Sequence, residues 1–419
     1  MKFIHLSDLH IGKMLERYRL IEDQRFILDQ IVDIIEAESP DAVLISGDVY
    51  DRSVPPEETV DVLGDFLVRI SRITLPNGGK MQIFLSSGNH DSAERLAFCR
   101  ALLKESGLHI SPVYDGNIEP FVMKDEFGEV YIYMLPFLKP VYVREALKNI
   151  YRKQYNIGPN DFIEEDHPFA AAVKQLEKIS SYNDAVKKAI ELMNVDPEKR
   201  NIILTHQFLA NSRTCDSEMP NVGGLDAIDA ELYHDFNYVA LGHLHTPQKL
   251  NTEGGNKNVV YYCGTPLKYS FSEEMSKSVA VVSIDGEGCV DLRKIPLTPL
   301  RDLRTIRGTF DEIISSQQGS TDYIRVILED KQLLSHFSND LKKLFPNLVT
   351  IDTKAARLES TGGTFSSDDI SPDIGPAAIF KQFFKIMNDR DMTDDEEKHI
   401  VSLIESVIED MSSGSKGEI

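Results

Sequence analysis

Residues 1–13, MKFIHLSDLHIGK, combine a short apolar run with two polar side chains, Asp8 and His10, immediately after it. Residues 2–7 have the length and the apolar character of a buried β-strand, and apolar residues then recur at helical spacing over residues 20–34. The opening of the chain therefore predicts a strand that carries a carboxylate and an imidazole at its carboxyl end, followed by a helix.

The same order repeats through the first hundred residues. Residues 41–46 form a second apolar run, residues 55–70 carry an apolar helical face after two prolines, and residues 81–86 form a third run before a helix that begins near Ser92. Alternation of strands and helices favours an α/β fold with helices on the faces of a sheet. In such folds the functional loops leave the carboxyl ends of the strands.

The rest of the chain continues this domain and then changes pattern. Strand patterns at 129–135, 201–205, 236–241 and 259–263 extend the first domain to residue 275. We expect four parts in all, namely an α/β domain at 1–275, a small α+β domain at 276–350, a linker at 351–375 and an amphipathic helical hairpin at 376–411. So small a hairpin cannot bury its apolar faces alone, so it must pack on its own chain or on a partner.

Composition excludes several classes of protein. The 419 residues include 45 basic and 67 acidic side chains, a net charge of −22, and 42% are hydrophobic, as in an ordinary globular protein. No apolar run approaches the roughly 18–20 residues that a membrane-spanning helix requires, and the N-terminus turns polar too early for a signal peptide. The four cysteines form no C-x-x-C pair and predict reduced thiols. We therefore expect a cytoplasmic protein with no membrane segment.

Five short segments share one chemistry, and each directly follows a predicted strand. Carboxylates and imidazoles dominate them, with glycines that permit a tight backbone around an ion. They are Asp8-Leu9-His10, Gly47-Asp48-Val49-Tyr50-Asp51, Gly88-Asn89-His90-Asp91, Thr205-His206 and Gly242-His243-Leu244-His245.

The segments contain more candidate metal ligands than one ion can use. Seven ligands suit two ions that share a carboxylate, and Asp48 is the natural bridge. Mixed imidazole and carboxylate ligation favours manganese, iron or zinc over magnesium, and two ions roughly 3.5–4 Å apart stabilise an in-line displacement at phosphorus. The pattern therefore predicts hydrolysis of a phosphate ester at two metal ions. Their ligands would be Asp8, His10, Asp48, Asn89, His206, His243 and His245.

His90 is not needed as a ligand and is the candidate catalytic residue. A histidine beside two metal ions can stabilise the oxyanion or protonate the leaving alkoxide. The alternative is that His90 only orients other groups. Asp51 and Asp91 are candidates for orienting the imidazoles.

The ordered set D-x-H, G-D-x-x-D, G-N-H-D, H and G-H-x-H resembles the calcineurin-like metallophosphoesterase superfamily. Three longer runs are similar to the SbcD family of nuclease subunits of bacterial SbcCD complexes. They are residues 1–13, residues 47–56 (GDVYDRSVPP) and residues 238–245 (YVALGHLH). The resemblance is strong over residues 1–275 and extends to the rest of the chain only by the order of its parts.

This resemblance implies a two-sheet sandwich flanked by helices, with a capping domain that helps to bind DNA. It also implies two manganese ions, one held by Asp8, His10, Asp48 and His245 and the other by Asp48, Asn89, His206 and His243, with His90 as the catalytic histidine. The activity implied is exonuclease action on double-stranded ends and endonuclease action on single strands or hairpins, in DNA repair, replication and recombination. The implied partners are DNA, a coiled-coil ATPase bound by the hairpin, and a second copy of the nuclease within a heterotetramer.

An acidic chain repels DNA at long range, which argues against DNA as a partner. The distribution of the charge along the chain weakens this argument. Residues 351–419 carry 15 acidic and 7 basic side chains, so a net charge of −8 lies outside the catalytic and capping parts. Arg301, Arg304 and Arg307 are candidate DNA contacts.

Two other functions are compatible with the pattern. A small phosphate ester could be the substrate, because a fold and a metal site do not determine the substrate. The chain could also be a non-catalytic subunit that recognises DNA ends, although a complete set of ligands together with His90 argues against it.

Overall fold

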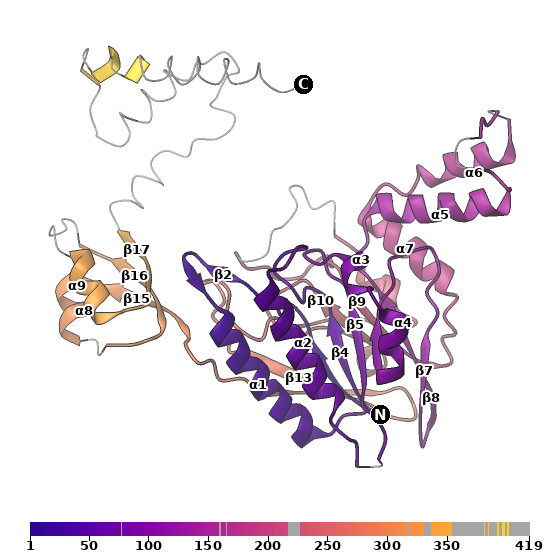
Figure 1. The fold of residues 1–419 in the computed structure, drawn as a ribbon, viewed down its shortest axis with the longest axis horizontal. Coiled ribbons are helices and arrows are strands. Elements are labelled where there is room, and N and C mark those ends of the chain that lie inside the picture. The colour runs from indigo at the N-terminus through magenta and orange to yellow at the C-terminus, as the bar shows by residue number, and fades with distance from the viewer. Residues whose placement is uncertain are drawn as a thin grey trace. The chain divides into compact units, whose positions relative to one another are not determined.

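The computed structural model describes residues 1–353 except 77, 159–160, 165, 217–226, 317–318 and 331–336, together with 381, 384, 392–393, 396–398 and 400–401. The chain divides into two compact units, Met1–Leu303 and Arg304–Ile419. The predicted α/β class is confirmed, because two large mixed sheets with flanking helices form the first unit (Figure 1).

The first sheet has six strands in the order β14-β13-β1-β4-β5-β6. β1, β4, β5 and β6 are parallel, β13 runs antiparallel to β1, and β14 runs antiparallel to β13. The strands are β1 (Lys2–Leu6), β4 (Ala42–Ser46), β5 (Gln82–Ser86), β6 (Leu108–Ile110), β13 (Ser278–Ile284) and β14 (Val290–Pro296).

The second sheet also has six strands, in the order β11-β12-β10-β9-β8-β7. Its four central strands are parallel and its two edge strands are antiparallel to their neighbours. The strands are β7 (Phe121–Asp125), β8 (Gly128–Leu135), β9 (Arg200–His206), β10 (Tyr238–Gly242), β11 (Gln248–Leu250) and β12 (Val259–Tyr262).

An apolar layer joins the two sheets face to face. Side chains alternate along a strand, so Phe3 of β1 points into this layer while Ile4 lies on the opposite face of the sheet. From the second sheet Ile202, Tyr238 and Val259 complete the layer. The predicted two-sheet sandwich is therefore present.

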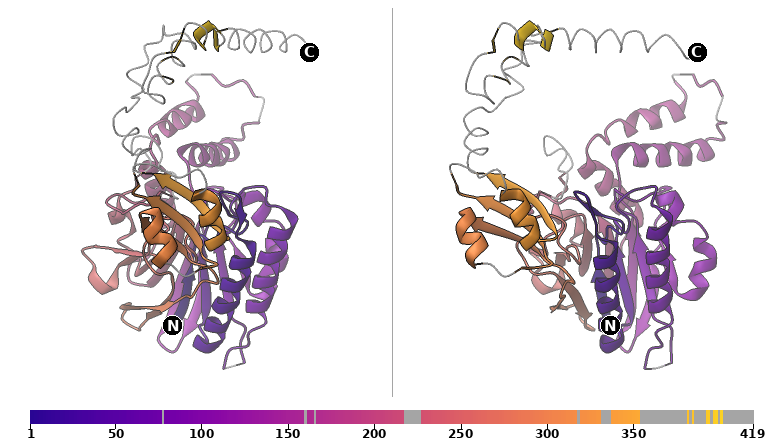
Figure 2. Two further views of the ribbon diagram at one scale, coloured as in Figure 1. Left: turned by 90° about the vertical axis from the view of Figure 1, so that its left-hand side faces the viewer. Right: turned by 60° about the vertical axis from the view of Figure 1, so that its left-hand side comes forward.

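Helices cover the outer faces of both sheets. α1 (Ile21–Glu38) and α2 (Glu57–Ser71) pack together beside the first sheet. α5 (Pro140–Gln154) and α7 (Tyr182–Met193) contribute buried residues to the apolar cluster of the second sheet, and α6 (Pro168–Leu176) pairs with α5 in an arm that projects from the unit (Figures 1 and 2). Short helices α3 (Ala93–Leu96) and α4 (Arg100–Leu103) follow β5, and a two-stranded ribbon, β2 (Met14–Leu15) and β3 (Tyr18–Arg19), precedes α1.

The helix α2 illustrates how the sequence forms these elements. Pro56 is its extended N-cap residue, and two glutamates in the first turn favour the positive end of the helix dipole. Val62, Leu63, Phe66 and Ile70 then recur at helical spacing and are buried, which fixes the face that packs inward.

The second unit is a small α+β domain. It contains β15 (Leu303–Gly308), β16 (Tyr323–Leu328) and β17 (Leu348–Thr353) in one sheet, with α8 (Phe310–Ser316) and α9 (Phe337–Leu344). Its core is made by Ile324, Val326, Leu341 and Phe345 among others.

The boundary between the two units differs from the predicted one. Residues 278–296 were expected in the small domain, but β13 pairs with β1 and β14 pairs with β13, so both strands belong to the first sheet. The division therefore lies after Leu303 rather than at residue 276. Local patterns identified these strands, but the pairing partner is more than 270 residues away in the sequence and leaves no local signal.

The structure describes only a small part of the predicted linker and hairpin. β17 continues to Thr353, so the first residues of the predicted linker 351–375 form a strand. The rest of this linker and nearly all of the predicted hairpin 376–411 lie outside the described residues. Of the helices in the described part of the chain, none is both long and apolar enough to cross a membrane.

Candidate metal centre

All five sequence segments meet at the carboxyl ends of β1, β4, β5, β9 and β10. Their loops are bonded to one another: the backbone N–H of Asp8 donates to the Gly47 carbonyl over 3.0 Å, and that of His10 donates to the Asp48 carbonyl over 2.9 Å. The backbone N–H of His243 donates to the Asp8 carboxylate over 3.0 Å. These bonds bring residues from both sheets into one cluster.

The ligand loops have an unusual backbone. Asp8, His10, Asp48 and His243 have φ angles of 52°, 42°, 49° and 105°, a region that most side chains avoid. Such conformations persist only where the surroundings enforce them, and they concentrate at functional sites.

Two glycines permit the loops to approach one another closely. A Cβ atom on Gly88 would lie 2.1 Å from Asp48 Oδ1, and one on Gly242 would lie 1.9 Å from the Ser46 carbonyl oxygen. Neither position can accept a side chain without displacing the neighbouring loop. The glycines in G-N-H-D and G-H-x-H are therefore required by space.

His10 lies in the half of the cluster that also contains Asp8 and His245. One ligand atom from each of the three lies within 4.8 Å of the other two. Both ring nitrogens of His10 are buried and have no hydrogen-bond partner in the described structure, although Nε2 lies 3.7 Å from Asp48 Oδ2. An unsatisfied buried imidazole is costly, and coordination of a metal ion would satisfy it.

The other half of the cluster surrounds Asp48 and His206. His206 Nε2 lies 3.2 Å from Asp48 Oδ2 and 3.0 Å from Asn89 Oδ1, which is itself 3.0 Å from His243 Nδ1. The Nδ1–H group of His206 donates to the Ser46 carbonyl over 2.8 Å, which leaves Nε2 facing these oxygens; Nε2 would present its lone pair there to a bound cation. Ligand atoms facing one another in this way fit a shared cation.

The charges in the cluster favour a cation as well. Burial and the nearby Asp48 raise the pKa of Asp8 to about 6. Burial opposes ionisation of His206, but the carboxylates of Asp48 and Asp8 raise its pKa to about 9. The two buried carboxylates thus attract positive charge, and the donor set of oxygen and imidazole nitrogen fits a divalent transition metal.

His90 lies at the edge of the cluster and is half-buried. Its backbone N–H donates to Asp48 Oδ1 over 2.8 Å, and its ring Nδ1 lies 3.0 Å from the Asp51 carbonyl oxygen, which can only accept. The ring centroid is 4.9 Å from that of His10. Nδ1 therefore carries a proton, and Nε2 is the ring nitrogen that this hydrogen bond leaves free.

Asp51 and Asp91 differ in what they contact. Asp51 Oδ1 lies 3.8 Å from His10 Nδ1 and 2.8 Å from Lys13 Nζ, so it faces an imidazole as expected. Asp91 instead accepts the backbone N–H groups of Gly88 over 2.9 Å and Tyr50 over 3.1 Å. The role of Asp91 is to join two loops rather than to orient an imidazole.

Sequence reasoning missed a buried network behind His245. Glu273 Oε1 lies 3.6 Å from His245 Nδ1, and Lys277 Nζ donates to the His245 carbonyl over 2.8 Å and to Glu273. Although burial opposes it, these two neighbours lower the pKa of Glu273 to about 2. A glutamate and a lysine four residues apart in a loop have no distinctive sequence signal.

A second missed residue is Gln24 on α1. Its side-chain amide donates to the His10 carbonyl over 2.8 Å, and its oxygen accepts the Gly12 N–H over 2.9 Å. The helix therefore holds the first ligand loop in place. The signal was a polar side chain on the buried face of an amphipathic helix.

Two of the three arginines expected to contact DNA are engaged within the protein. Arg301 pairs with Asp23 at 2.9 Å and also with Glu22, and Arg304 pairs with Asp322 at 3.2 Å. Each of these two arginines therefore already has a carboxylate partner within the protein.

The chain is similar to known proteins along most of its length. Residues 1–247 match the calcineurin-like phosphoesterase family, and residues 299–388 match a family described as the type 5 capsule protein repressor C-terminal domain. The SbcD subunit of the nuclease SbcCD from Staphylococcus epidermidis is 29% identical over 414 residues, which cover 96% of this chain and 99% of that protein. A solved dimetal phosphatase from Danio rerio is 11% identical with a TM-score of 0.39, over 72% of this chain and 98% of its own.

The first of these matches spans more than half of the 419 residues and includes all seven expected metal ligands. The strands that carry those ligands are the ones whose carboxyl ends converge in the structure. On this evidence the chain belongs to the calcineurin-like phosphoesterase family.

Proposed function

We propose that the chain is the nuclease subunit of an SbcCD-type complex and hydrolyses DNA phosphodiesters at a dinuclear metal centre. The observation that carries the proposal is the pair of buried carboxylates, Asp8 and Asp48, with ligand atoms within 4.8 Å of each other and of His206. The likeness to an SbcD nuclease subunit along 96% of the chain supports DNA as the substrate.

Two divalent ions, Mn²⁺ in our proposal, would share the Asp48 carboxylate. One would be held by Asp8, His10, Asp48 and His245, and the other by Asp48, Asn89, His206 and His243. When bound, such ions polarise the phosphodiester and lower the pKa of water to generate a nucleophile. The choice of manganese rests on the mixed imidazole and carboxylate donors.

His90 would supply a proton to the leaving oxygen. Its Nδ1–H donates to the Asp51 carbonyl over 3.0 Å, which fixes the ring and leaves Nε2 as the nitrogen that would face the substrate. In the protonated ring Nε2 is a donor. Protonation of the leaving alkoxide by a positioned histidine typically contributes about 10²–10⁴-fold in rate.

The proposed substrates are double-stranded ends for exonuclease action and single strands or hairpins for endonuclease action, in repair, replication and recombination. The unit that begins at Arg304 would cap the site and help to bind DNA, and residues 376–411 would bind a coiled-coil ATPase. A second copy of the chain would complete a heterotetramer that works on cytoplasmic, nucleoid DNA. The match of residues 299–388 to a second family supports a dedicated role for this region.

The test is cleavage of end-labelled linear duplex and of a DNA hairpin by the purified chain with manganese, with magnesium and with a chelator. Asp48→Ala and His90→Asn are measured beside the wild type, with bound metal determined in each. We expect manganese-dependent cutting, loss of metal and activity in Asp48→Ala, and retained metal with about 10²–10⁴-fold slower cutting in His90→Asn.

Other results would identify the alternatives. Fast turnover of a chromogenic phosphate ester without cutting of DNA would indicate a small-molecule phosphoesterase. Tight binding of DNA ends with no hydrolysis of either substrate would indicate a non-catalytic subunit. Undiminished cutting by His90→Asn would restrict His90 to an orienting role.

A further inference from the structure

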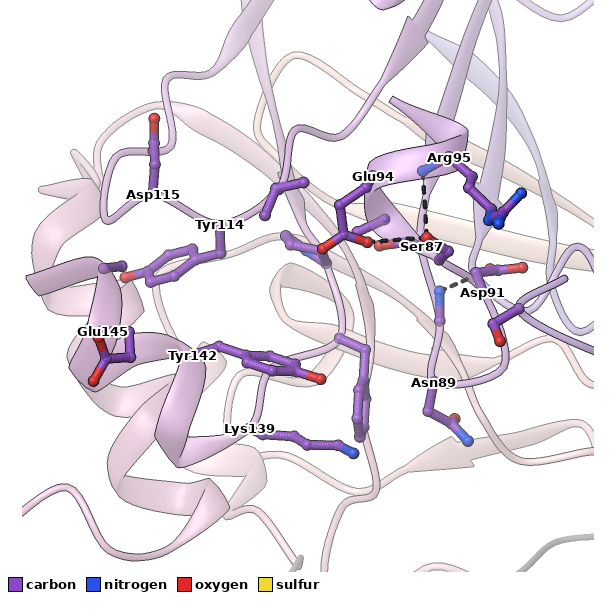
Figure 3. A pocket seen from close by; sticks show the side chains of 18 of the residues that line it. Ser87, Asn89, Asp91, Glu94, Arg95, Tyr114, Asp115, Lys139, Tyr142 and Glu145 are labelled. Carbon is purple, nitrogen blue, oxygen red and sulfur yellow. Dashed lines mark hydrogen bonds between the residues drawn. The ribbon is translucent and has the colours of Figure 1, made fainter. Parts of the chain in front are cut away.

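A pocket of about 670 Å³ opens beside Asn89 of the metal centre. One wall is the loop after β5 with α3, and the other is the start of α5 (Figure 3). Its volume lies within the roughly 300–1,000 Å³ of small-molecule sites. The proposed nuclease reaction does not by itself assign a role to this pocket.

Aromatic side chains line the pocket on the side of α5. Tyr142 is 48% exposed, and Figure 3 shows its ring extended into the pocket alongside Lys139. The Lys139 ammonium lies 6.0 Å from the centroid of that ring. Phe137 also lines the pocket, and its ring packs edge-on against His206 at a centroid distance of 6.4 Å, so the aromatic wall reaches the metal centre.

Three cations line the pocket beside four carboxylates. Arg95, Lys139 and Lys153 line it, and none of the three forms an ion pair within the part of the chain that the structure describes. The carboxylates of the lining each already accept a hydrogen bond or an ion pair from the protein: Asp91 from Gly88, Glu94 from Ser92, Asp115 from Asn117 and Glu145 from Lys148. Because the three cations have no carboxylate partner among the described residues, they can contact a phosphate.

An exposed aromatic ring beside a free lysine suits single-stranded nucleic acid. Bases of any sequence stack on such a ring while cations contact the backbone. A paired base cannot reach into a pocket of this kind unless it leaves its stack. The pocket therefore suits one unpaired nucleotide rather than intact duplex.

We infer that this pocket binds the unpaired nucleotide next to the scissile phosphodiester, with its base on Tyr142 and its phosphate at Lys139. This inference rests on the proposed nuclease function. It implies that the nucleotide next to the scissile bond must be unpaired for cutting. A frayed end, a hairpin loop and a single strand all offer such a nucleotide.

The inference is tested with the full-length chain carrying His90→Asn, so that binding is measured without rapid cutting. The probes are a fluorescein-labelled single-stranded oligonucleotide, followed by anisotropy, and the same strand with 2-aminopurine, whose fluorescence is quenched by stacking. Tyr142→Ala should weaken binding about 5- to 150-fold and abolish the quenching, as expected for loss of one stacked base. Tyr142→Phe keeps the ring and should bind normally.

Phe127→Ala is the matched control, because Phe127 is 57% exposed in the turn between β7 and β8 and lies outside the pocket lining. It should leave oligonucleotide affinity unchanged. Lys139→Gln should weaken binding and reduce its dependence on salt.

Equal affinity and equal quenching in Tyr142→Ala and the parent would overturn the inference. An equal loss of affinity for a blunt duplex with clamped ends would also overturn it, because the pocket would then not select an unpaired base. If the variants behave as expected but the chain with His90 intact does not cut DNA with manganese, the proposed nuclease function alone fails.

Discussion

His245 is presented to the metal cluster by residues that are not themselves ligands. Glu273 faces its Nδ1 atom at 3.6 Å, and Lys277 holds its carbonyl oxygen at 2.8 Å. The carboxylate fixes both the tautomer and the orientation of the ring, and it raises the basicity of the nitrogen that would bind the metal.

We predict that Glu273→Gln lowers the affinity for Mn²⁺ about 10–100-fold, the usual effect of losing such an outer partner. The amide keeps the volume but removes the charge that Lys277 and His245 share. Manganese binding by electron paramagnetic resonance measures the effect independently of activity. Glu274→Gln is the control, because Glu274 is exposed next to it in the chain, and equal metal affinity in the two variants would refute the role of Glu273.

Gly88 tests whether the close approach of two loops is required. Its Cβ would lie 2.1 Å from Asp48 Oδ1 and 2.4 Å from the Asp48 nitrogen, so Gly88→Ala should displace Asp48 and abolish metal binding while leaving the protein folded.

The matched variant is Gly64→Ala in α2, where a Cβ meets nothing within 4 Å. It should raise the free energy of unfolding by about 1 kcal/mol, because alanine is the better helix former. Calorimetry and metal titration of both variants check these expectations. Normal metal binding by Gly88→Ala would show that the loops can separate without consequence.

Among the elements, β13 completes the first sheet. It pairs with β1 along the side opposite β4 and buries Val279, Val281 and Val282. Each of these side chains contributes roughly 1.5–3 kcal/mol by burial, and without β13 the strand that carries Asp8 and His10 becomes an unprotected edge.

We therefore predict that a chain shortened to residues 1–303 unfolds cooperatively, whereas one shortened to residues 1–275 aggregates or unfolds without a transition. Thermal unfolding followed by circular dichroism, together with size-exclusion chromatography, distinguishes them. A stable, monomeric 1–275 fragment would contradict the assignment of β13 and β14 to the first unit.

At the scale of the whole molecule, stability should depend on pH through buried neutral histidines. His5 lies between the sheets, hydrogen-bonded to the Tyr238 hydroxyl over 2.8 Å, and burial lowers its pKa to about 3. The unfolded chain binds a proton at this residue below its ordinary pKa of about 6.5, whereas the folded protein does not until about 3. Acid therefore favours the unfolded state.

As the pH falls from 6.5 to 5, this residue should lower the free energy of unfolding by about 2 kcal/mol. Urea unfolding of wild type and His5→Gln at both pH values isolates the effect, because the variant lacks the titrating group. The difference in the free energy of unfolding between the two proteins should shift by that amount toward the variant at pH 5. A difference independent of pH would mean that His5 has the same pKa in the folded and unfolded states.

Much of the site was predictable because its residues are adjacent to strands. A strand followed by Asp8 and His10, or by Gly47 and Asp48, specifies both the element and the chemistry at its end, and parallel strands bring such ends to one edge. Local order along the sequence was therefore enough to expect the seven ligands and an α/β sheet, whereas the two-sheet sandwich was implied by the resemblance to the metallophosphoesterase superfamily.

The sequence by itself determined which polar side chains stand at the ends of strands, since the apolar periods set the strands and the motifs follow them directly. Only the tertiary structure decided that β13 and β14 belong to the first sheet, that Glu273 and Lys277 stand behind His245, and that a pocket with Tyr142 opens beside Asn89. The reason is physical: pairing, burial and pocket shape depend on contacts between residues far apart in the chain, and no local pattern encodes such contacts.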